Sequence, residues 1–183
     1  WQYTNQWKQL KNSVATPVCT GEDIYLLEGF KDLIDNEAVS IVHPDLATSG
    51  GILETKRIGD YAQQRGIPMA LHQAGSPVVA MANVHCAAAT EGFIGLEMHS
   101  VDNPWWDDLV TGETDKIINN GFVKVPESPG LGIELNEDAV NEHLNTNPDG
   151  WGGSSTELEI YPTGAFEPTD EWTNLDSHDR TWS

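Results

Sequence analysis

The fold is decided by residues 38–72, which read AVSIVHPDLATSGGILETKRIGDYAQQRGIPMALH. The stretch opens with a short apolar run, 38–42, which is typical of a buried strand. The break His43-Pro44-Asp45 ends that strand, and residues 50–66 have the spacing of an amphipathic helix between two glycine boundaries. A second apolar run, 67–71, follows directly. The pattern therefore predicts a strand–helix–strand unit.

The same alternation continues on both sides of this unit. Residues 14–20 form another β-branched apolar run, and residues 23–36 carry apolar side chains at helical spacing. Pro77 begins an alanine-rich helix that continues to about Thr90, and residues 93–96 form a fourth apolar run. For the helix over 50–66 we expect one apolar face, made of Ile52, Leu53, Ile58 and Tyr61. Near-continuous apolar strands alternating with helices predict parallel β-sheet in an α/β fold.

The rest of the chain has a different pattern. Residues 121–125 favour a short strand, and residues 136–144 favour a short helix with Asn136 as its N-cap. Residues 147–154 have loop composition, and the tail runs to residue 183. We expect two parts, a barrel portion over 1–120 and a C-terminal segment over 121–183 that returns to a capping region.

Composition excludes several classes of partner. The chain has 183 residues, with 29 acidic against 9 basic side chains and a formal net charge of −20. Nucleic acids and anionic membranes both require a basic footprint, so neither is expected as a partner. No apolar run approaches a membrane span, and no strand is followed by a dinucleotide or phosphate-loop motif. The acidic excess is read either as adaptation to high salt or as an ordinary solvated surface.

Two further features bear on the protein's context. Cys19 and Cys86 are too few for a disulfide framework, so free thiols and a cytoplasmic location are expected. The chain begins with Trp1 rather than methionine, which favours a fragment of a longer protein. Trp172 and Trp182 then need partners in an absent half or in a neighbouring subunit.

Ionisable residues follow the predicted strands in register. Glu22, Asp45, His72 and Glu97 each stand at or just past the end of a strand, at intervals of 23, 27 and 25 positions. In a β/α barrel the C-terminal strand ends meet around one mouth, where the chemistry is placed. A histidine beside an aspartate from the preceding strand can form a carboxylate–imidazole pair suited to general-base catalysis.

Each of these residues also has an ordinary structural interpretation. Glu22 could cap the following helix, Asp45 could be a turn residue, and His72 could be a core histidine with satisfied hydrogen bonds. Glu97 could be confused with Glu91 by spacing alone.

Other polar and aromatic residues are expected to be structural. We assign no chemistry to the remaining histidines of the first part, which are His43, His85 and His99. The pair Trp105-Trp106 could line the mouth, or it could pack beneath it and anchor a loop.

Taken in order, the motifs resemble a known family. Thr20-Gly21-Glu22, His43-Pro44-Asp45 with Gly50-Gly51, Ala70-Leu71-His72 and Leu96-Glu97 resemble the enolase superfamily. Within it they are similar to the mandelate racemase/muconate lactonizing enzyme branch, and most to sugar-acid dehydratases of the galactonate type. The segment Pro129 to Leu135 also resembles the stretch that these proteins carry after the barrel. The resemblance covers about residues 14 to 144.

The resemblance implies a specific architecture and cofactor. The chain would hold about strands five to eight of an enolase-type β/α barrel, plus a C-terminal extension. Three carboxylates on successive strands hold Mg²⁺ in that family, and Glu22 matches the third. The other two have no counterpart in this chain, so a missing N-terminal half is expected as a partner, together with a homo-oligomer.

The resemblance also implies the residue roles. His72, oriented by Asp45, would take the α-proton of a sugar acid. Glu97, if a buried site kept it protonated, would donate a hydrogen bond to the developing enolate oxygen. Loss of the β-hydroxyl would then give a 2-keto-3-deoxy acid. A racemase or epimerase of the same superfamily and a non-catalytic structural subunit remain as rivals.

Overall fold

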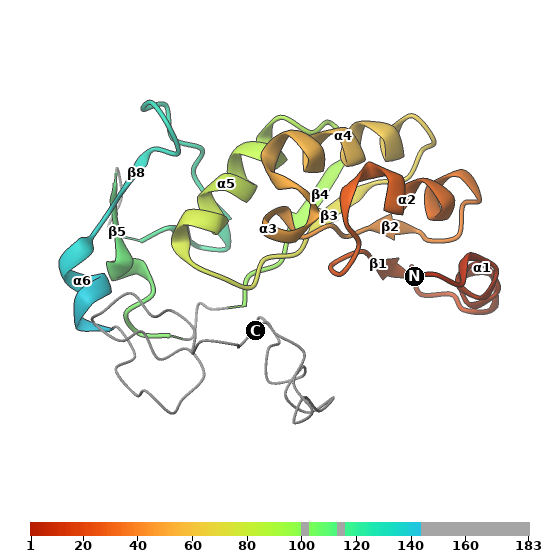
Figure 1. The fold of residues 1–183 in the computed structure, drawn as a ribbon, viewed down its shortest axis with the longest axis horizontal. Helices are drawn as coiled ribbons and strands as arrows, with labels where there is room; N and C mark the ends of the chain where they lie inside the picture. Colours follow the sequence, from red (N-terminus) through yellow and green to blue (C-terminus); the bar gives the residue numbers. More distant parts are fainter. Residues whose placement is uncertain (100–102, 113–115, 144–183) are drawn as a thin grey trace, which may run out of the picture.

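A four-stranded parallel sheet forms the centre of the computed structural model, which describes residues 1–99, 103–112 and 116–143. Its strands follow one another in sequence order, with helices between them (Figure 1). The elements of this part are α1 (Thr4–Ser13), β1 (Cys19–Thr20), α2 (Leu26–Asp35), β2 (Ile41–Val42), α3 (Leu46–Ser49), α4 (Gly51–Gln63), β3 (Met69–Leu71), α5 (Pro77–Ala88) and β4 (Phe93–Leu96). The predicted α/β architecture is confirmed.

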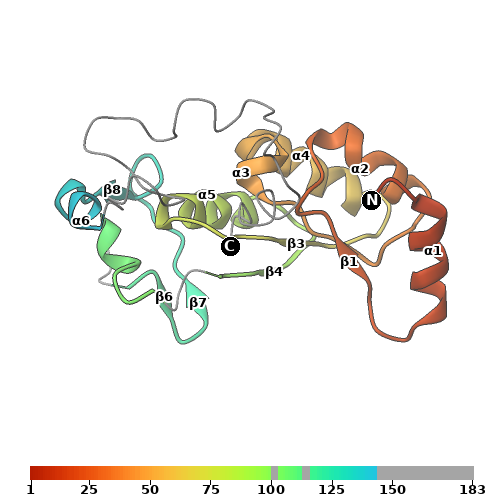
Figure 2. The ribbon, with the colours of Figure 1, turned by 60° about the horizontal axis from the view of Figure 1, so that its bottom comes forward.

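The helices α2, α4 and α5 lie on one side of the sheet, as Figure 2 shows. Every adjacent pair of strands is parallel, with Cys19 opposite Ile41 and Val42 opposite Met69. Each crossover returns the chain to the same end of the sheet, so all four strands finish at the opposite end. We call this end, where the strands finish, the carboxyl edge. Residues that follow the strands are therefore neighbours in space.

The main hydrophobic core fills the space between the helices and the sheet. Its largest fully buried side chains include Phe30, Ile58 and Met69. Ala38 and Val39 are also fully buried, although the β2 ladder begins only at Ile41. The run 38–42 thus predicted burial more accurately than strand length, whereas the run 14–20, predicted as a buried strand, is largely exposed, with Val14 44% exposed.

Three of the four strands are shorter than predicted. The run 14–20 pairs only over Cys19–Thr20, and the run 67–71 pairs only from Met69. Each run carries a proline, Pro17 or Pro68, which has no N–H to donate to a ladder. The strand over 93–96 has the predicted bounds.

The predicted apolar face of α4 is wrong for two residues. Ile58 is fully buried, whereas Ile52 and Leu53 are 45% and 74% exposed. At about 100° per residue, positions 52 and 53 point well away from position 58. The side of α4 that faces the core is made of Thr55, Ile58, Gly59 and Ala62.

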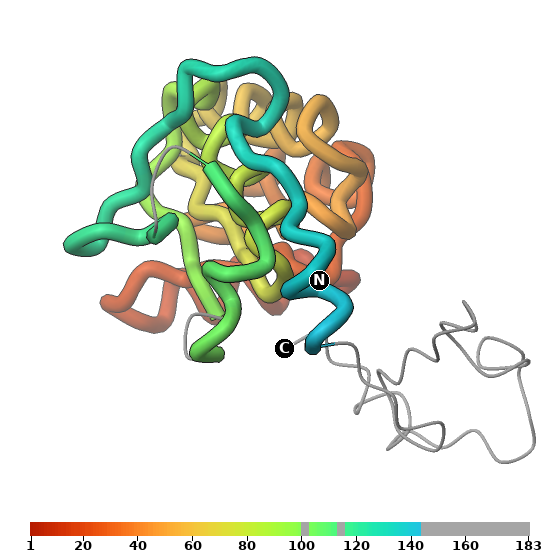
Figure 3. Tube along the Cα trace, turned by 90° about the vertical axis from the view of Figure 1, so that its left-hand side faces the viewer, coloured from red at the N-terminus to blue at the C-terminus, as the bar shows by residue number. Residues whose placement is uncertain are grey.

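The C-terminal part packs against α5 and covers one end of the molecule (Figure 3). Its elements are η2 (Asp107–Leu109), β5 (Val110–Gly112), β6 (Ile118–Asn119), β7 (Phe122–Val123), β8 (Ile133–Leu135) and α6 (Glu137–Glu142). The predicted strand over 121–125 corresponds to β7, and Asn136 caps α6 by accepting from the Ala139 N–H at 3.3 Å.

Two antiparallel pairs, β5–β8 and β6–β7, organise this part. Residue 120 lies in the turn of the β6–β7 hairpin. The division of the chain into parts 1–120 and 121–183 stays a prediction. The predicted loop over 147–154, the tail and its tryptophans lie outside the described residues. Among the helices of the described part, none is long and apolar enough to cross a membrane.

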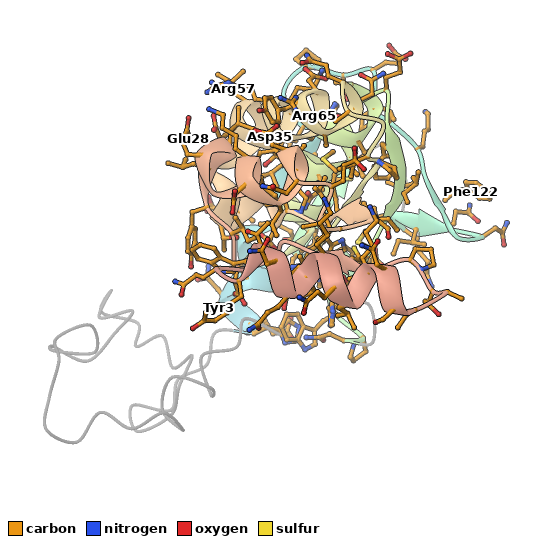
Figure 4. All side chains as sticks on the ribbon, turned by 90° about the vertical axis from the view of Figure 1, so that its right-hand side faces the viewer. Tyr3, Glu28, Asp35, Arg57, Arg65 and Phe122 are labelled. Atoms are coloured by element: carbon orange, nitrogen blue, oxygen red, sulfur yellow. The ribbon has the colours of Figure 1, made fainter. Side chains whose placement is uncertain are left out.

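The helices α2 and α4 carry several exposed ion pairs. Arg65 pairs with Asp35 across α2 and α4 and stacks over Tyr61 (Figure 4). Phe122, in contrast, projects from the β6–β7 hairpin and is 79% exposed. Exposed ion pairs such as Arg65–Asp35 contribute little to stability, so the buried core supplies most of the stabilisation.

Gly21, directly after β1, is a position where a small change should harm the fold. Its φ is +150°, and an added Cβ would lie 2.8 Å from both the His43 carbonyl carbon and the Phe30 ring. We expect Gly21→Ala to lower the free energy of unfolding by about 1–3 kcal/mol, measured by urea denaturation. The matched control is Gly95→Ala in β4, where an added Cβ meets nothing within 4 Å. Equal stability of the two variants would contradict this account.

Candidate active site

The four predicted site residues meet at the carboxyl edge of the sheet. His72 lies at their centre, with its Nδ1 2.7 Å from Asp45 Oδ2 and its Nε2 3.0 Å from Glu22 Oε2. The backbone N–H of His72 donates to the Pro44 carbonyl at 3.1 Å, which extends the β2–β3 pairing beyond the strands. The structure therefore brings Glu22, Asp45 and His72 into direct contact.

Asp45 divides its two carboxylate oxygens between two tasks. Oδ1 accepts from the backbone N–H groups of Ala47 and Thr48 at 2.7 and 3.2 Å, which caps the short helix α3. Oδ2 accepts from His72 Nδ1. The turn interpretation and the catalytic interpretation of Asp45 are thus compatible, one for each oxygen.

The Asp45 contact fixes the state of the imidazole ring. A carboxylate only accepts hydrogen bonds, so His72 Nδ1 is the donor to Asp45. Nε2 can donate to Glu22, 3.0 Å away, only when the ring is protonated, and it carries the lone pair when the ring is neutral. Both side chains are about 10% exposed, so solvent competes little for this hydrogen bond. Nε2 is the atom of this pair that could take a proton from a bound molecule.

Glu97 follows β4 and is held between two histidines. Its Oε2 accepts from His43 Nε2 at 2.6 Å, and its Oε1 accepts from His99 Nε2 at 2.7 Å. The rival Glu91 precedes β4 and accepts from Gln63 on α4, so it lies at the opposite edge of the sheet. The spacing ambiguity between the two glutamates is therefore resolved in favour of Glu97.

Burial does not keep Glu97 protonated in the described structure, so the condition for its donor role is not met. Partial burial raises the pKa of Glu97, but the hydrogen bonds from His43 and His99 outweigh it, and the net pKa lies below the ordinary value. The side chain is 40% exposed, so the cost of its charge is small. Glu97 is thus a carboxylate that accepts hydrogen bonds.

His43 and His99 are the site residues that sequence reasoning missed. The His72 ring centroid lies 5.6 Å from that of His43 and 5.5 Å from that of His99. The signal for His99 was its position two residues after Glu97, since alternate residues of an extended segment share a face. His85 is structural as expected, because its Nε2 contacts the Leu131 carbonyl at 3.2 Å.

Two buried side chains donate to the Gly75 carbonyl close to the site. Gln73 is fully buried and donates to the Gly75 carbonyl at 3.0 Å. Trp106 donates to the same carbonyl at 2.8 Å and is 4% exposed, which confirms its role as a buried loop anchor. Trp105 stacks on His143 with ring centroids 4.4 Å apart.

The donor set bears on which metal this edge could hold. Mg²⁺ prefers oxygen ligands and keeps several waters. Glu22 presents an exposed carboxylate, whereas both Glu97 oxygens are occupied by histidines. Glu22 therefore fits as one magnesium ligand, whereas Glu97 does not while both histidines donate to it.

Comparison with known proteins gives consistent similarities. The model of a family described as "Enolase C-terminal domain-like" matches residues 1–139. The chain is 42% identical over 137 residues to a D-xylonate dehydratase of Haloferax volcanii, covering 75% of this chain and 33% of that protein. It is 30% identical over 135 residues to a D-galactonate dehydratase family member of Pantoea ananatis, covering 72% and 32%.

A solved structure gives the same result. A mandelate racemase/muconate lactonizing enzyme-like protein of Rubrobacter xylanophilus is similar with a TM-score of 0.74 and 39% identity, over 76% of this chain and 36% of that one. The chain therefore spans about a third of the length of the relatives that it matches.

The pKa of Glu97 should depend on its two histidines. We expect His99→Gln to raise that pKa towards the ordinary value, because one of the two hydrogen bonds that lower it is weakened. The measurement is the ¹³C carboxyl shift of Glu97 as a function of pH. His85→Gln is the control and should leave the Glu97 titration unchanged.

The sign of the accompanying stability change follows from linkage. Because the folded pKa of Glu97 is lowered, its contribution to stability is present above the unfolded pKa. That contribution is lost as the pH falls through the folded pKa. An identical acid-side stability profile for the parent chain and His99→Gln would contradict this assignment.

Proposed function

Because the chain belongs to the enolase C-terminal domain-like family, which matches residues 1–139, we propose that it carries the proton-abstracting half of a magnesium-dependent sugar-acid dehydratase. The observation that carries the proposal is the His72–Asp45 pair, 2.7 Å apart at the edge where all four parallel strands end. The relatives named above are a D-xylonate dehydratase and a member of the D-galactonate dehydratase family, and both names refer to aldonic acids. The proposed substrate is therefore an aldonic acid, and the proposed reaction is loss of water.

His72 Nε2 is the proposed general base. A proton next to a carboxylate is very weakly acidic, so its removal needs a base held at a fixed position and a neighbourhood that accepts charge. Asp45 fixes the ring through Nδ1, so the proton moves onto Nε2. The Glu22 carboxylate, 3.0 Å from Nε2, then lies beside the imidazolium that forms.

Glu22 is also the residue of this chain that would hold the metal. When bound, magnesium would act as a Lewis acid on the carboxylate of the substrate and favour loss of its α-proton. Carboxylates from outside this chain would complete the ligand set, since both Glu97 oxygens accept from histidines. The acid that assists the leaving hydroxyl is likewise proposed to lie outside this chain.

Glu97 is proposed as a positioning residue. As a carboxylate it cannot donate a hydrogen bond to a developing enolate oxygen, which corrects the role expected from the resemblance. It accepts from His43 instead and so holds that ring 5.6 Å from His72. Elimination of the β-hydroxyl would give a 2-keto-3-deoxy acid.

The rest of the molecule is proposed to complete the barrel. Within the described residues β1 and β4 are the edge strands of the sheet, and each has one paired neighbour. Ile94 on β4 is 58% exposed, so this strand leaves apolar surface for further strands to cover. A longer protein or a partner chain would supply them, and a homo-oligomer is proposed in addition. Cys19 and Cys86 are both free thiols, which is compatible with a cytoplasmic location.

A racemase or epimerase is the second candidate, because the structurally similar protein of R. xylanophilus is described as mandelate racemase-like. The same His72–Asp45 pair would serve either reaction, since both begin with loss of an α-proton. The two reactions differ in the fate of the deprotonated acid. A dehydratase expels the β-hydroxyl and forms a keto acid, whereas a racemase returns a proton to the same carbon.

A panel of aldonic acids tests the proposal on the complete protein with Mg²⁺. We expect formation of a 2-keto-3-deoxy acid from at least one member, detected by its reaction with semicarbazide. Exchange of the α-proton with solvent deuterium and no keto product would favour the racemase. Neither product nor exchange from any acid would favour a non-catalytic subunit.

Asp45→Asn is the sharpest variant for the role of the pair. Asparagine is a good N-cap, so α3 should remain folded. Its one carbonyl oxygen cannot both cap α3 and accept from His72 Nδ1, so the ring loses its fixed tautomer. We expect kcat to fall by about 10²–10⁴-fold, as expected for loss of a positioned general base. His85→Gln should retain activity, and an Asp45→Asn variant with full activity would refute the assignment.

A further inference from the structure

We propose that His72, Glu97 and His99 form a binding site for a transition-metal cation such as Zn²⁺, distinct in its ligands from the magnesium site. One ligand atom from each residue lies within 4.8 Å of the other two. Among the described residues this is the group of histidine, cysteine and carboxylate side chains that meets such a distance limit.

The ligand types favour zinc over magnesium. Imidazole nitrogen is a preferred ligand of Zn²⁺, Ni²⁺ and Cu²⁺, whereas Mg²⁺ selects oxygen. Two imidazoles and one carboxylate form a ligand set known from zinc sites that keep an open fourth position. The magnesium candidate Glu22 is not one of the three.

His72 is already held in the way that a metal-binding histidine requires. Metal-bound histidines commonly donate their second ring N–H to a carboxylate, which fixes the tautomer and makes the free nitrogen a better ligand. Asp45 accepts from His72 Nδ1 at 2.7 Å, so Nε2 is the ligand atom, and zinc would replace its 3.0 Å contact with Glu22 Oε2. The hydrogen bonds of Asp45 to the α3 backbone fix this carboxylate in turn.

The other two ligands can move the short distance that remains. Zinc bonds of about 2.0–2.2 Å place tetrahedral nitrogen and oxygen ligands roughly 3.3 Å apart. His99 Nε2 and Glu97 Oε1 are 2.7 Å apart in a hydrogen bond that zinc would replace, and the two side chains, 45% and 40% exposed, can rotate to bind the metal beside the fixed His72 ring. His43, which donates to Glu97 Oε2, keeps that carboxylate near the site.

The nearby thiol is a poorer ligand. Burial raises the pKa of Cys19, and the negative charge of Glu97 raises it further. Since the thiolate is the form that binds metal, Cys19 stays mostly protonated at neutral pH. The histidine–glutamate group is therefore the expected site.

Zinc in this site would block proton transfer. His72 Nε2 has one lone pair, which can bind either a metal or the α-proton of a substrate. This consequence rests on the proposed function, whereas metal binding itself does not. Zinc should therefore inhibit the enzyme even when Mg²⁺ is saturating.

Cobalt absorption tests the site on the 183-residue chain without any need for activity. Co²⁺ should bind with visible d–d bands, and Zn²⁺ should displace it while excess Mg²⁺ should not. We expect His99→Gln to weaken Zn²⁺ binding by at least about tenfold, and Asp45→Asn to weaken it by about 10–100-fold. Circular dichroism verifies that each variant is folded.

Two control variants keep the test discriminating. His85→Gln removes a histidine of α5 outside the group, and Cys19→Ser removes the nearby thiol; both should retain binding. Displacement of Co²⁺ by Mg²⁺, equal loss of binding in His85→Gln and His99→Gln, or loss in Cys19→Ser would each overturn the proposal.

Inhibition of the complete protein provides the second readout. We expect His99→Gln to need at least about tenfold more Zn²⁺ for half inhibition. Zinc bound by the chain with no dehydratase activity would refute the proposed function and leave the metal site standing. Dehydratase activity with no cobalt or zinc binding would refute the metal site and leave the proposed function standing.

Discussion

Parallel pairing of β2 with β3 is the constraint on which the site depends. Because the two strands run in the same direction, they end at the same edge, and the residues just beyond them come into contact. The bridge between Asp45 and His72 continues this pairing past the last strand residues. The 2.7 Å contact between their side chains is therefore set by backbone geometry, and the chemistry of the edge depends on it.

The edge is an alternating arrangement of acids and imidazoles. Glu22 and Asp45 flank His72, while His43 and His99 flank Glu97. In a chain with a formal charge of −20, this is the part of the described structure where histidines gather. The same grouping that suits proton transfer also suits transition-metal cations, because proton transfer and metal binding both use the lone pair of an imidazole nitrogen.

Sequence patterns predicted the fold and the convergence of Glu22, Asp45 and His72, because apolar periodicity and strand order determine where the chain returns. They overestimated strand lengths, since a ladder depends on N–H donors that Pro17 and Pro68 lack. They missed His43 and His99 and the ionised state of Glu97 for one shared reason. The pKa of a carboxyl group depends on its neighbours in space, which spacing along the chain does not give.

The cap on α3 has a consequence for sequence variation. Asp45 is oriented by the main-chain amides of residues 47 and 48, which are present whatever side chains those positions carry. Ala47 and Thr48 could therefore be exchanged for almost any residue without turning the carboxylate away from its histidine. Proline is the exception, because it would remove the donor itself. Drift at position 47 is thus compatible with an unchanged reaction centre, whereas Thr48 also donates from its hydroxyl to the Glu22 carbonyl at 3.1 Å.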